Sequence, residues 1–207
     1  SRVTPSLRLV LVRHGQTTAN ATGILDTRLP GHPLDEEGRR QAAELAGRLA
    51  GEPVVAVYAS QALRAQQTAE PVAARHGLPV QVLGGVHEVS IGDLEGRHRL
   101  EDHQSLHELY RAWHDGDLDQ ARPGGESGKQ LLDRYLADVA AIRTRHLTGT
   151  AVLVSHGAAT RLAVVALASN VPGSFAAPRL LPNAATVLLE ADGAGWRCLR
   201  WDDIDLG

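Results

Sequence analysis

The sequence predicts a single α/β domain: a three-layer α/β/α sandwich with a mostly parallel central sheet. Short apolar runs rich in Val and Leu, typical of buried strands, alternate with longer segments typical of helices. The alternation continues along all 207 residues without an internal repeat or a low-complexity stretch. Both observations favour one domain over residues 1–207.

The first half of the chain carries clear start and stop signals. An apolar strand over residues 7–12 ends at Arg13-His14-Gly15, and glycine and proline mark residues 20–34 as a loop. A helix begins after Asp35, whose carboxylate can cap it, and runs to about residue 50.

The later elements continue the alternation. Ser127 to Gln130 form a capping-box pattern, which predicts a helix running to about residue 146. Three further helices are expected over residues 63–76, 100–114 and 158–169. The remaining strands are expected over residues 54–58, 80–83, 150–155, 185–190 and 196–201, with a turn at Asp192-Gly193 joining the last two.

Composition excludes several classes of protein. The balance of 43% hydrophobic and 22% charged residues excludes disorder, collagen and coiled coil. A net charge of −3 argues against a dedicated nucleic-acid binder, and no apolar run is long enough to span a membrane. Cys198 is the only cysteine and no secretion signal is visible, so we expect a cytoplasmic protein without disulfides.

Polar side chains gather where the predicted parallel strands end. In open α/β sheets, ligands bind beyond the carboxyl ends of the strands. The residues that follow four of these strands are Arg13-His14, Ser60 and Arg64, His87-Glu88, and Ser155-His156.

This set of residues suits an enzyme that handles phosphate. Arginine offers a planar fork of donors that matches a phosphoryl group, although carboxylate or sulfate could also bind. A neutral histidine can attack the phosphorus if its other nitrogen is held by a hydrogen bond. A glutamate beside it could protonate the leaving oxygen and then deprotonate water. The residues therefore indicate a two-step phosphoryl transfer through a phosphohistidine.

Five motifs carry a resemblance to a known family. They are Leu11-Val12-Arg13-His14-Gly15-Gln16-Thr17, the stretch from Ser60 to Ala69, His87-Glu88 with Gly92 to Gly96, Gly125-Glu126-Ser127, and Ser155-His156-Gly157. In this order the sequence resembles the histidine phosphatase superfamily, which includes the cofactor-dependent phosphoglycerate mutases. The resemblance covers about residues 7–190, and it implies a phosphoglycerate mutase-like fold.

The resemblance also implies a role for each matching residue. His14 would be the phosphorylated nucleophile, and Glu88 the general acid and base. Arg13, Arg64 and His156 would bind the phosphoryl group, and Asn20 would touch one of its oxygens. The arginines would supply the positive charge, so neither a metal nor a cofactor is expected. The expected partner is a small phosphorylated metabolite, and the resemblance implies a homodimer.

The sequence favours a phosphatase over a mutase. The mutases of this superfamily carry a tyrosine soon after the acidic residue and an adjacent arginine pair, which hold the substrate carboxylate. This chain has Ile91 three residues after Glu88 and no adjacent arginine pair between residues 100 and 123. A mutase remains the first alternative, and a catalytically silent phosphate-binding regulatory protein is the second.

Weaker features surround the expected site. The polar segment over residues 97–122 is expected to be a lid, and its His98, His103, His107 and His114 could instead include a metal pair at 103 and 107. Arg97 and His98 could reach the far end of an anionic substrate, or they are surface groups. The candidate substrate-pocket residues are Thr17, Ile24, His32, Arg97, His98 and Ala158.

Overall fold

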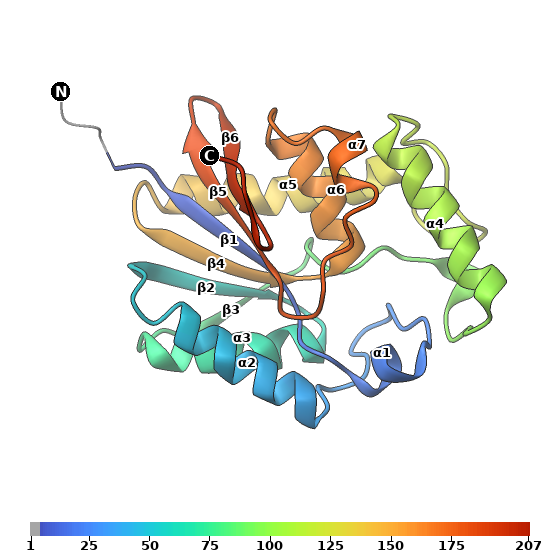
Figure 1. The fold of residues 1–207 in the computed structure, drawn as a ribbon, viewed down its shortest axis with the longest axis horizontal. Coiled ribbons are helices and arrows are strands. Elements are labelled where there is room, and N and C mark those ends of the chain that lie inside the picture. The colour runs from blue at the N-terminus through green and yellow to red at the C-terminus, as the bar shows by residue number, and fades with distance from the viewer. Residues whose placement is uncertain (1–4) are drawn as a thin grey trace.

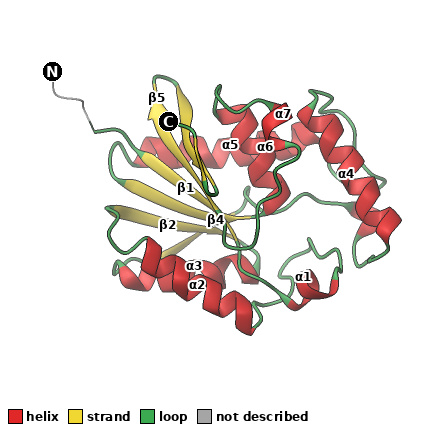
Figure 2. Ribbon diagram, viewed as in Figure 1, coloured by secondary structure: helices red, strands yellow, loops and turns green. Residues whose placement is uncertain are grey.

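The computed structural model describes residues 5–207 and arranges them in three layers (Figures 1 and 2). The middle layer is a seven-stranded sheet with the order β3-β2-β4-β1-β5-β6-β7. Helices α2 (Glu36–Arg48) and α3 (Leu63–Arg75) cover one face of the sheet, and α5 (Gly128–Arg145) and α6 (Gly157–Leu167) cover the other. The predicted single-domain α/β fold is confirmed.

The centre of the sheet is parallel, as predicted, and one side of it is antiparallel. β4 lies between β1 and β2 and pairs with both in parallel. All six residues of β4 are buried, as expected for a strand covered on both faces. The parallel strands are β1 (Arg8–Arg13), β2 (Val54–Ser60), β3 (Val80–Leu83) and β4 (Thr150–Ser155). The antiparallel strands are β5 (Thr186–Asp192), β6 (Gly195–Trp201) and β7 (Ile204–Asp205).

The helices begin where the capping signals place them. The Asp35 side chain accepts a hydrogen bond from Gly38 N and caps α2, and Ser127 with Gln130 forms the predicted capping box of α5. Helix α4 (Leu100–His114) has the predicted bounds and packs against α6 and α7 (Gly173–Ala176). The short α7 and a 3₁₀ turn over Gly92–Leu94 were not predicted.

The predicted loop over residues 20–34 is wrong at its start. Helix α1 (Thr18–Thr22) reaches into it, because Thr17 and Asn20 form a capping box around a single turn. The helix stops at Gly23, whose φ of 75° is a left-handed conformation that favours glycine. After Gly23, the chain crosses the carboxyl-end edge of the sheet as a loop.

Two apolar clusters fix the layers. One lies between the sheet and α5 and α6, with Leu131, Tyr135 and Ile142 fully buried. The other lies beneath α2 and α3, and includes Leu45 and Val72. Because both faces of the parallel strands are covered, side chains that follow these strands are held on a rigid frame. No helix within residues 5–207 has the length and apolar character needed to cross a bilayer.

His114, at the end of α4, is expected to make the stability depend on pH. Burial and, to a lesser extent, the charge of Arg161 lower the pKa of His114 to about 4. The unfolded chain, with a histidine pKa near 6.5, then binds this proton more readily than the folded chain does. The free energy of unfolding should therefore fall as the pH drops below about 6.5. In His114→Phe, the loss between about pH 7.5 and about pH 5 should be smaller by roughly 1 kcal/mol.

Urea unfolding of the wild type and the variant at both pH values measures this difference. His98→Gln is the control, because His98 is exposed. An equal loss of stability in His114→Phe and the wild type would show that His114 does not contribute.

Candidate active site

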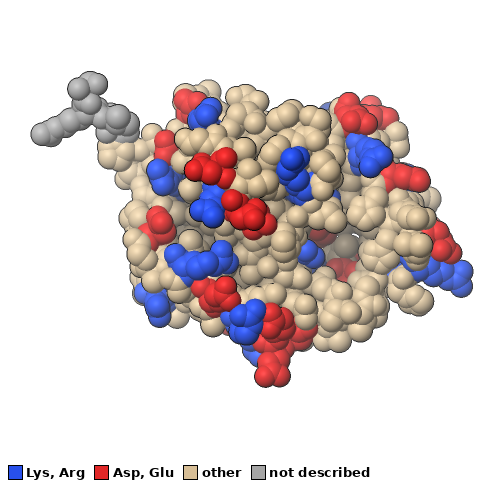
Figure 3. Space-filling view, viewed as in Figure 1, with Lys and Arg blue, Asp and Glu red and all other residues tan. Residues whose placement is uncertain are grey.

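A pocket of about 440 Å³ lies at the carboxyl ends of the central parallel strands. The surface is hollowed there in Figure 3, between the segments labelled α1 and α4 in Figure 1. α1 and the loop after it form one wall, and α4 forms another. The polar residues that line it are Arg13, His14, Asn20, Asp26, Thr27, Arg64, Glu88, His103, His107, Tyr110, His156 and Asn183. The structure thus brings together all six predicted catalytic and phosphate-binding residues.

His14 follows β1 and is held in one tautomer. Its Nδ1 lies 2.7 Å from Gly15 O, and its Nε2 lies 3.2 Å from Arg64 Nε. A carbonyl oxygen only accepts and a guanidinium N–H only donates, so the proton is on Nδ1 and the lone pair is on Nε2. The backbone at Gly15 passes against α2, where an added Cβ would lie 2.7 Å from Gly38 O.

His14 is also kept neutral. Only 4% of the residue is exposed. Burial lowers the pKa of His14 well below its usual value, and the charges of Arg64 and Arg13 lower it further. A neutral imidazole with a fixed Nε2 lone pair is the nucleophilic form of histidine.

His156 follows β4 and faces His14, with ring centroids 5.1 Å apart. Its Nδ1 lies 3.4 Å from Arg64 Nη2, which can only donate, so Nε2 carries the proton and donates to Ser60 Oγ at 2.7 Å. Burial, followed by the charge of Arg64, lowers the pKa of His156 well below its usual value. Ser60, at the end of β2, therefore fixes the orientation of a second neutral imidazole.

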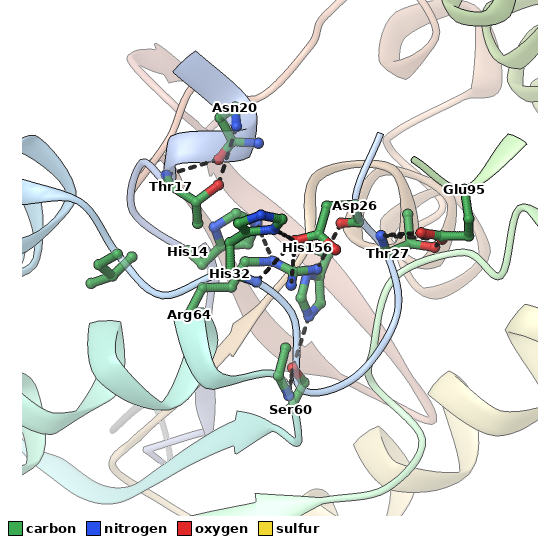
Figure 4. Close-up of polar contacts among 12 residues, drawn as sticks. His14, Thr17, Asn20, Asp26, Thr27, His32, Ser60, Arg64, Glu95 and His156 are labelled. Atoms are coloured by element: carbon green, nitrogen blue, oxygen red, sulfur yellow. Dashed lines mark hydrogen bonds and ion pairs between the residues drawn. The ribbon is translucent and has the colours of Figure 1, made fainter. Parts of the chain in front are cut away.

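Arg64 lies between the two histidines (Figure 4). It is 3% exposed, and its Nη2 donates to Asp26 O at 3.3 Å as well as to His156. Its Nη1 is buried without a hydrogen-bond partner in the described part of the chain and lies 3.9 Å from Asp26 Oδ2. A buried guanidinium N–H without an acceptor is a ready donor for an anion in the pocket.

Two further groups that carry N–H donors line the same pocket. Arg13, at the end of β1, is fixed by a 2.7 Å bond from Nη1 to Leu181 O. The Oδ1 of Asn20 accepts from Thr17 N and from Asn183 Nδ2, which leaves its own amide NH2 group as a donor toward the pocket.

Glu88 is seated on the first turn of α6. Its Oε1 accepts from Val89 N and Ala159 N, both at 2.9 Å, and its Oε2 accepts from Ala158 N at 3.1 Å. The positive end of the helix dipole favours an anionic side chain here. The carboxylate is therefore held in one orientation at the edge of the pocket.

The six candidate substrate-pocket residues are not all placed together. Ile24 and Ala158 line the pocket, whereas Thr17, His32, Arg97 and His98 lie outside its lining.

The contacts or the exposure of these four side chains explain why they do not line the pocket. Thr17 caps α1, and the Nδ1 of His32 donates to Asp26 Oδ2 at 2.6 Å (Figure 4). Arg97 turns outward, with its Nε donating to Asp93 O, and His98 is exposed.

Several lining residues were not among the candidate site residues. Asp26 and Thr27 come from the loop after α1, and Asn183 from the segment before β5. His103, Leu106, His107 and Tyr110 come from α4. His103 Nε2 donates to Gly23 O at 2.8 Å, which joins α4 to the end of α1. Within residues 5–207, no three His, Cys, Asp or Glu side chains form a cluster that could hold a metal ion.

The sequence is similar to those of known proteins. The family described as the histidine phosphatase superfamily (branch 1) matches residues 9–204. A metal-independent phosphoserine phosphatase of Arabidopsis thaliana is 32% identical over 199 residues, which cover 95% of this chain and 81% of that protein. Phosphoglycerate mutase-like protein 4 of the same plant is 31% identical over 202 residues, covering 95% and 85%.

A solved structure agrees with these matches. A mycobacterial glucosyl-3-phosphoglycerate phosphatase in complex with VO3 superposes with a TM-score of 0.82 at 29% identity. The superposition covers 94% of this chain and 98% of that one.

Proposed function

The chain belongs to the histidine phosphatase superfamily (branch 1), and from that membership we propose that it hydrolyses a small phosphate monoester through a phosphohistidine on His14. The observation that carries the proposal is the state of His14. Its imidazole is neutral, and its Nε2 lone pair lies in a pocket whose hydrogen-bond donors suit phosphoryl oxygens.

In the first step, a phosphoryl oxygen replaces His14 Nε2 as the acceptor of the Arg64 Nε–H. Nε2 then attacks phosphorus, the P–N bond forms, and the P–O bond to the leaving group breaks. Binding of the anionic ester beside the Glu88 carboxylate favours uptake of a proton by Glu88, which gives this proton to the leaving oxygen, so the product is a neutral alcohol. Arg13, Arg64, His156 and Asn20 hold the transferring oxygens, and such preorganised donors are the main source of catalysis in phosphoryl transfer.

In the second step, the Glu88 carboxylate takes a proton from water. The hydroxide oxygen attacks phosphorus, the P–N bond breaks, and inorganic phosphate leaves. Glu88 is protonated again and the lone pair of Nε2 is restored. Because two guanidinium groups supply the positive charge, we expect turnover to survive EDTA.

Hydrolysis is favoured over mutase activity by the environment of Glu88. The position where the mutases carry a tyrosine is Ile91, which is 1% exposed and belongs to the apolar core. It offers no donor to a substrate carboxylate. A mutase remains the second candidate, because one relative is named a phosphoglycerate mutase-like protein. Interconversion of phosphoglycerate isomers in the presence of bisphosphoglycerate, without release of phosphate, would favour it.

Glu88→Ala is expected to lower kcat for alkyl phosphates by about 10²- to 10⁴-fold. The leaving alkoxide loses its proton donor, and water loses its base. Phosphate release under steady-state conditions measures the effect. Glu101→Ala is the control, since Glu101 lies on exposed α4 surface. Unchanged turnover in the folded Glu88 variant would rule out this assignment of the acid and base.

A further inference from the structure

The pocket has a second end, remote from the phosphoryl donors. Here α4 presents His103, Leu106, His107 and Tyr110 toward the loop that carries Ile24 and Leu25. The spacing of the α4 residues places them on one face of the helix. We call these six residues the α4 subsite. In the proposed function, this end receives the leaving group.

The α4 subsite is built from neutral groups. Leu106 is 6% exposed, and Ile24 and Leu25 are half-buried. Partial burial lowers the pKa of His107, and the charges of Arg161 and Arg111 lower it further, which favours the neutral imidazole. Burial also raises the pKa of Tyr110 well above its usual value, which keeps the phenol protonated.

The subsite still offers hydrogen bonds. His103 Nε2 donates to Gly23 O, which leaves its Nδ1 for a ligand. The Tyr110 hydroxyl can both donate and accept. These groups match the hydroxyls of an uncharged alcohol, and the apolar side chains match its carbon skeleton.

Several arginines lie on segments that surround the α4 subsite, but none of them lines it. Arg161 is 4% exposed, and its Nη1 donates to Ala176 O and Ala177 O. Arg122 donates to Ser105 O from two nitrogens. Arg97 donates to Asp93 O and pairs with Asp102. Arg28 and Arg111 do not line the pocket itself but line neighbouring surface hollows, which share Glu88 and His107 with it.

The charged groups that do line the pocket disfavour a second anion. Both lining arginines, Arg13 and Arg64, belong to the phosphoryl end, and Asp26 and Glu88 add two carboxylates. A carboxylate on the leaving group would lose water without an ion pair to an arginine of the pocket lining, and it would meet the carboxylates of Asp26 and Glu88.

We propose that the α4 subsite selects phosphate esters of uncharged, hydroxyl-bearing alcohols and discriminates against esters whose leaving group carries a carboxylate. This inference rests on the proposed function and narrows its substrate class. It also gives a physical reason why the chain should handle phosphoglycerates poorly.

Glycerol 3-phosphate and 3-phosphoglycerate are a matched pair for the test, since they differ by a CH₂OH against a carboxylate. We expect kcat/KM to be at least about tenfold higher for glycerol 3-phosphate. His107→Arg places a permanent cation in the subsite at an exposed position. It should shift the ratio of the two kcat/KM values toward 3-phosphoglycerate by about fivefold.

Leu100→Arg is the matched control, because Leu100 is 71% exposed on the same helix and lies outside the pocket lining. It should leave the ratio unchanged. Equal or better turnover of 3-phosphoglycerate by the wild type would overturn the inference, as would an equal shift in both variants.

A second readout separates this inference from the proposed function. Hydrolysis of phenyl phosphate that depends on His14 tests the proposed hydrolysis independently of the α4 subsite. Its absence would rule out the proposed phosphatase activity. Calorimetric binding of the two esters to His14→Ala tests the subsite without turnover. Tighter binding of glycerol 3-phosphate supports the subsite, and equal or weaker binding overturns it.

Discussion

His14→Ala is expected to lower kcat by at least about 10⁴-fold, because the covalent route loses its nucleophile. His156, the histidine that faces His14, is not free to replace it. The Nε2 of His156 donates to Ser60, and the Nδ1 of His156 faces Arg64. The residual rate should be that of direct attack by water on the ester, helped only by the remaining phosphoryl donors.

Phosphate release by the variant, compared with the wild type, measures this loss. His98→Ala is the control, because His98 is exposed and outside the pocket lining. Circular dichroism confirms folding of both variants. Turnover of His14→Ala within tenfold of the wild type would exclude His14 as the nucleophile.

Arg64→Lys is expected to lower kcat/KM by about 10²- to 10³-fold and to weaken inhibition by inorganic phosphate. The guanidinium serves His14, His156 and Asp26 at once and still has a free Nη1. An ammonium group keeps the charge but cannot reproduce this planar set of donors. The loss should therefore appear despite the conserved charge.

Inhibition constants for phosphate and the pH profile of kcat/KM measure the effect of this substitution. Arg8→Lys, in an exposed ion pair with Glu190, is the control. Unchanged phosphate inhibition in Arg64→Lys would show that charge alone, rather than the fork of donors, holds the phosphoryl group.

The central residues of the site could be predicted from the sequence, because they directly follow the carboxyl ends of predicted parallel strands. Arg13, His14 and His156 follow β1 and β4, which pair in parallel, so their meeting at one edge follows from the topology. Glu88 and Arg64 were expected there for the same reason. The order of the motifs then gave each residue an expected role.

The walls of the pocket could not be predicted in the same way. The lid over residues 97–122 was expected from the sequence, but which face of α4 turns inward depends on its packing against α6 and α7, which are distant in sequence. The sequence therefore did not single out His103 and Tyr110 as lining residues. Thr17 and His32 were misplaced for the opposite reason. Each side chain forms a hydrogen bond with a neighbour in sequence: Thr17 accepts one from Asn20 N, and His32 donates one to Asp26.

The central claim, a phosphohistidine on His14, can be tested directly with Glu88→Ala and p-nitrophenyl phosphate. This ester has a good leaving group, so the first step needs little help from an acid, whereas the second step lacks its base. The variant should release one burst of p-nitrophenol per enzyme. An alkaline quench followed by mass spectrometry should find one phosphoryl group on the peptide that contains His14. Steady release without a burst, or a label that persists in the Glu88→Ala, His14→Ala double variant, would contradict the account.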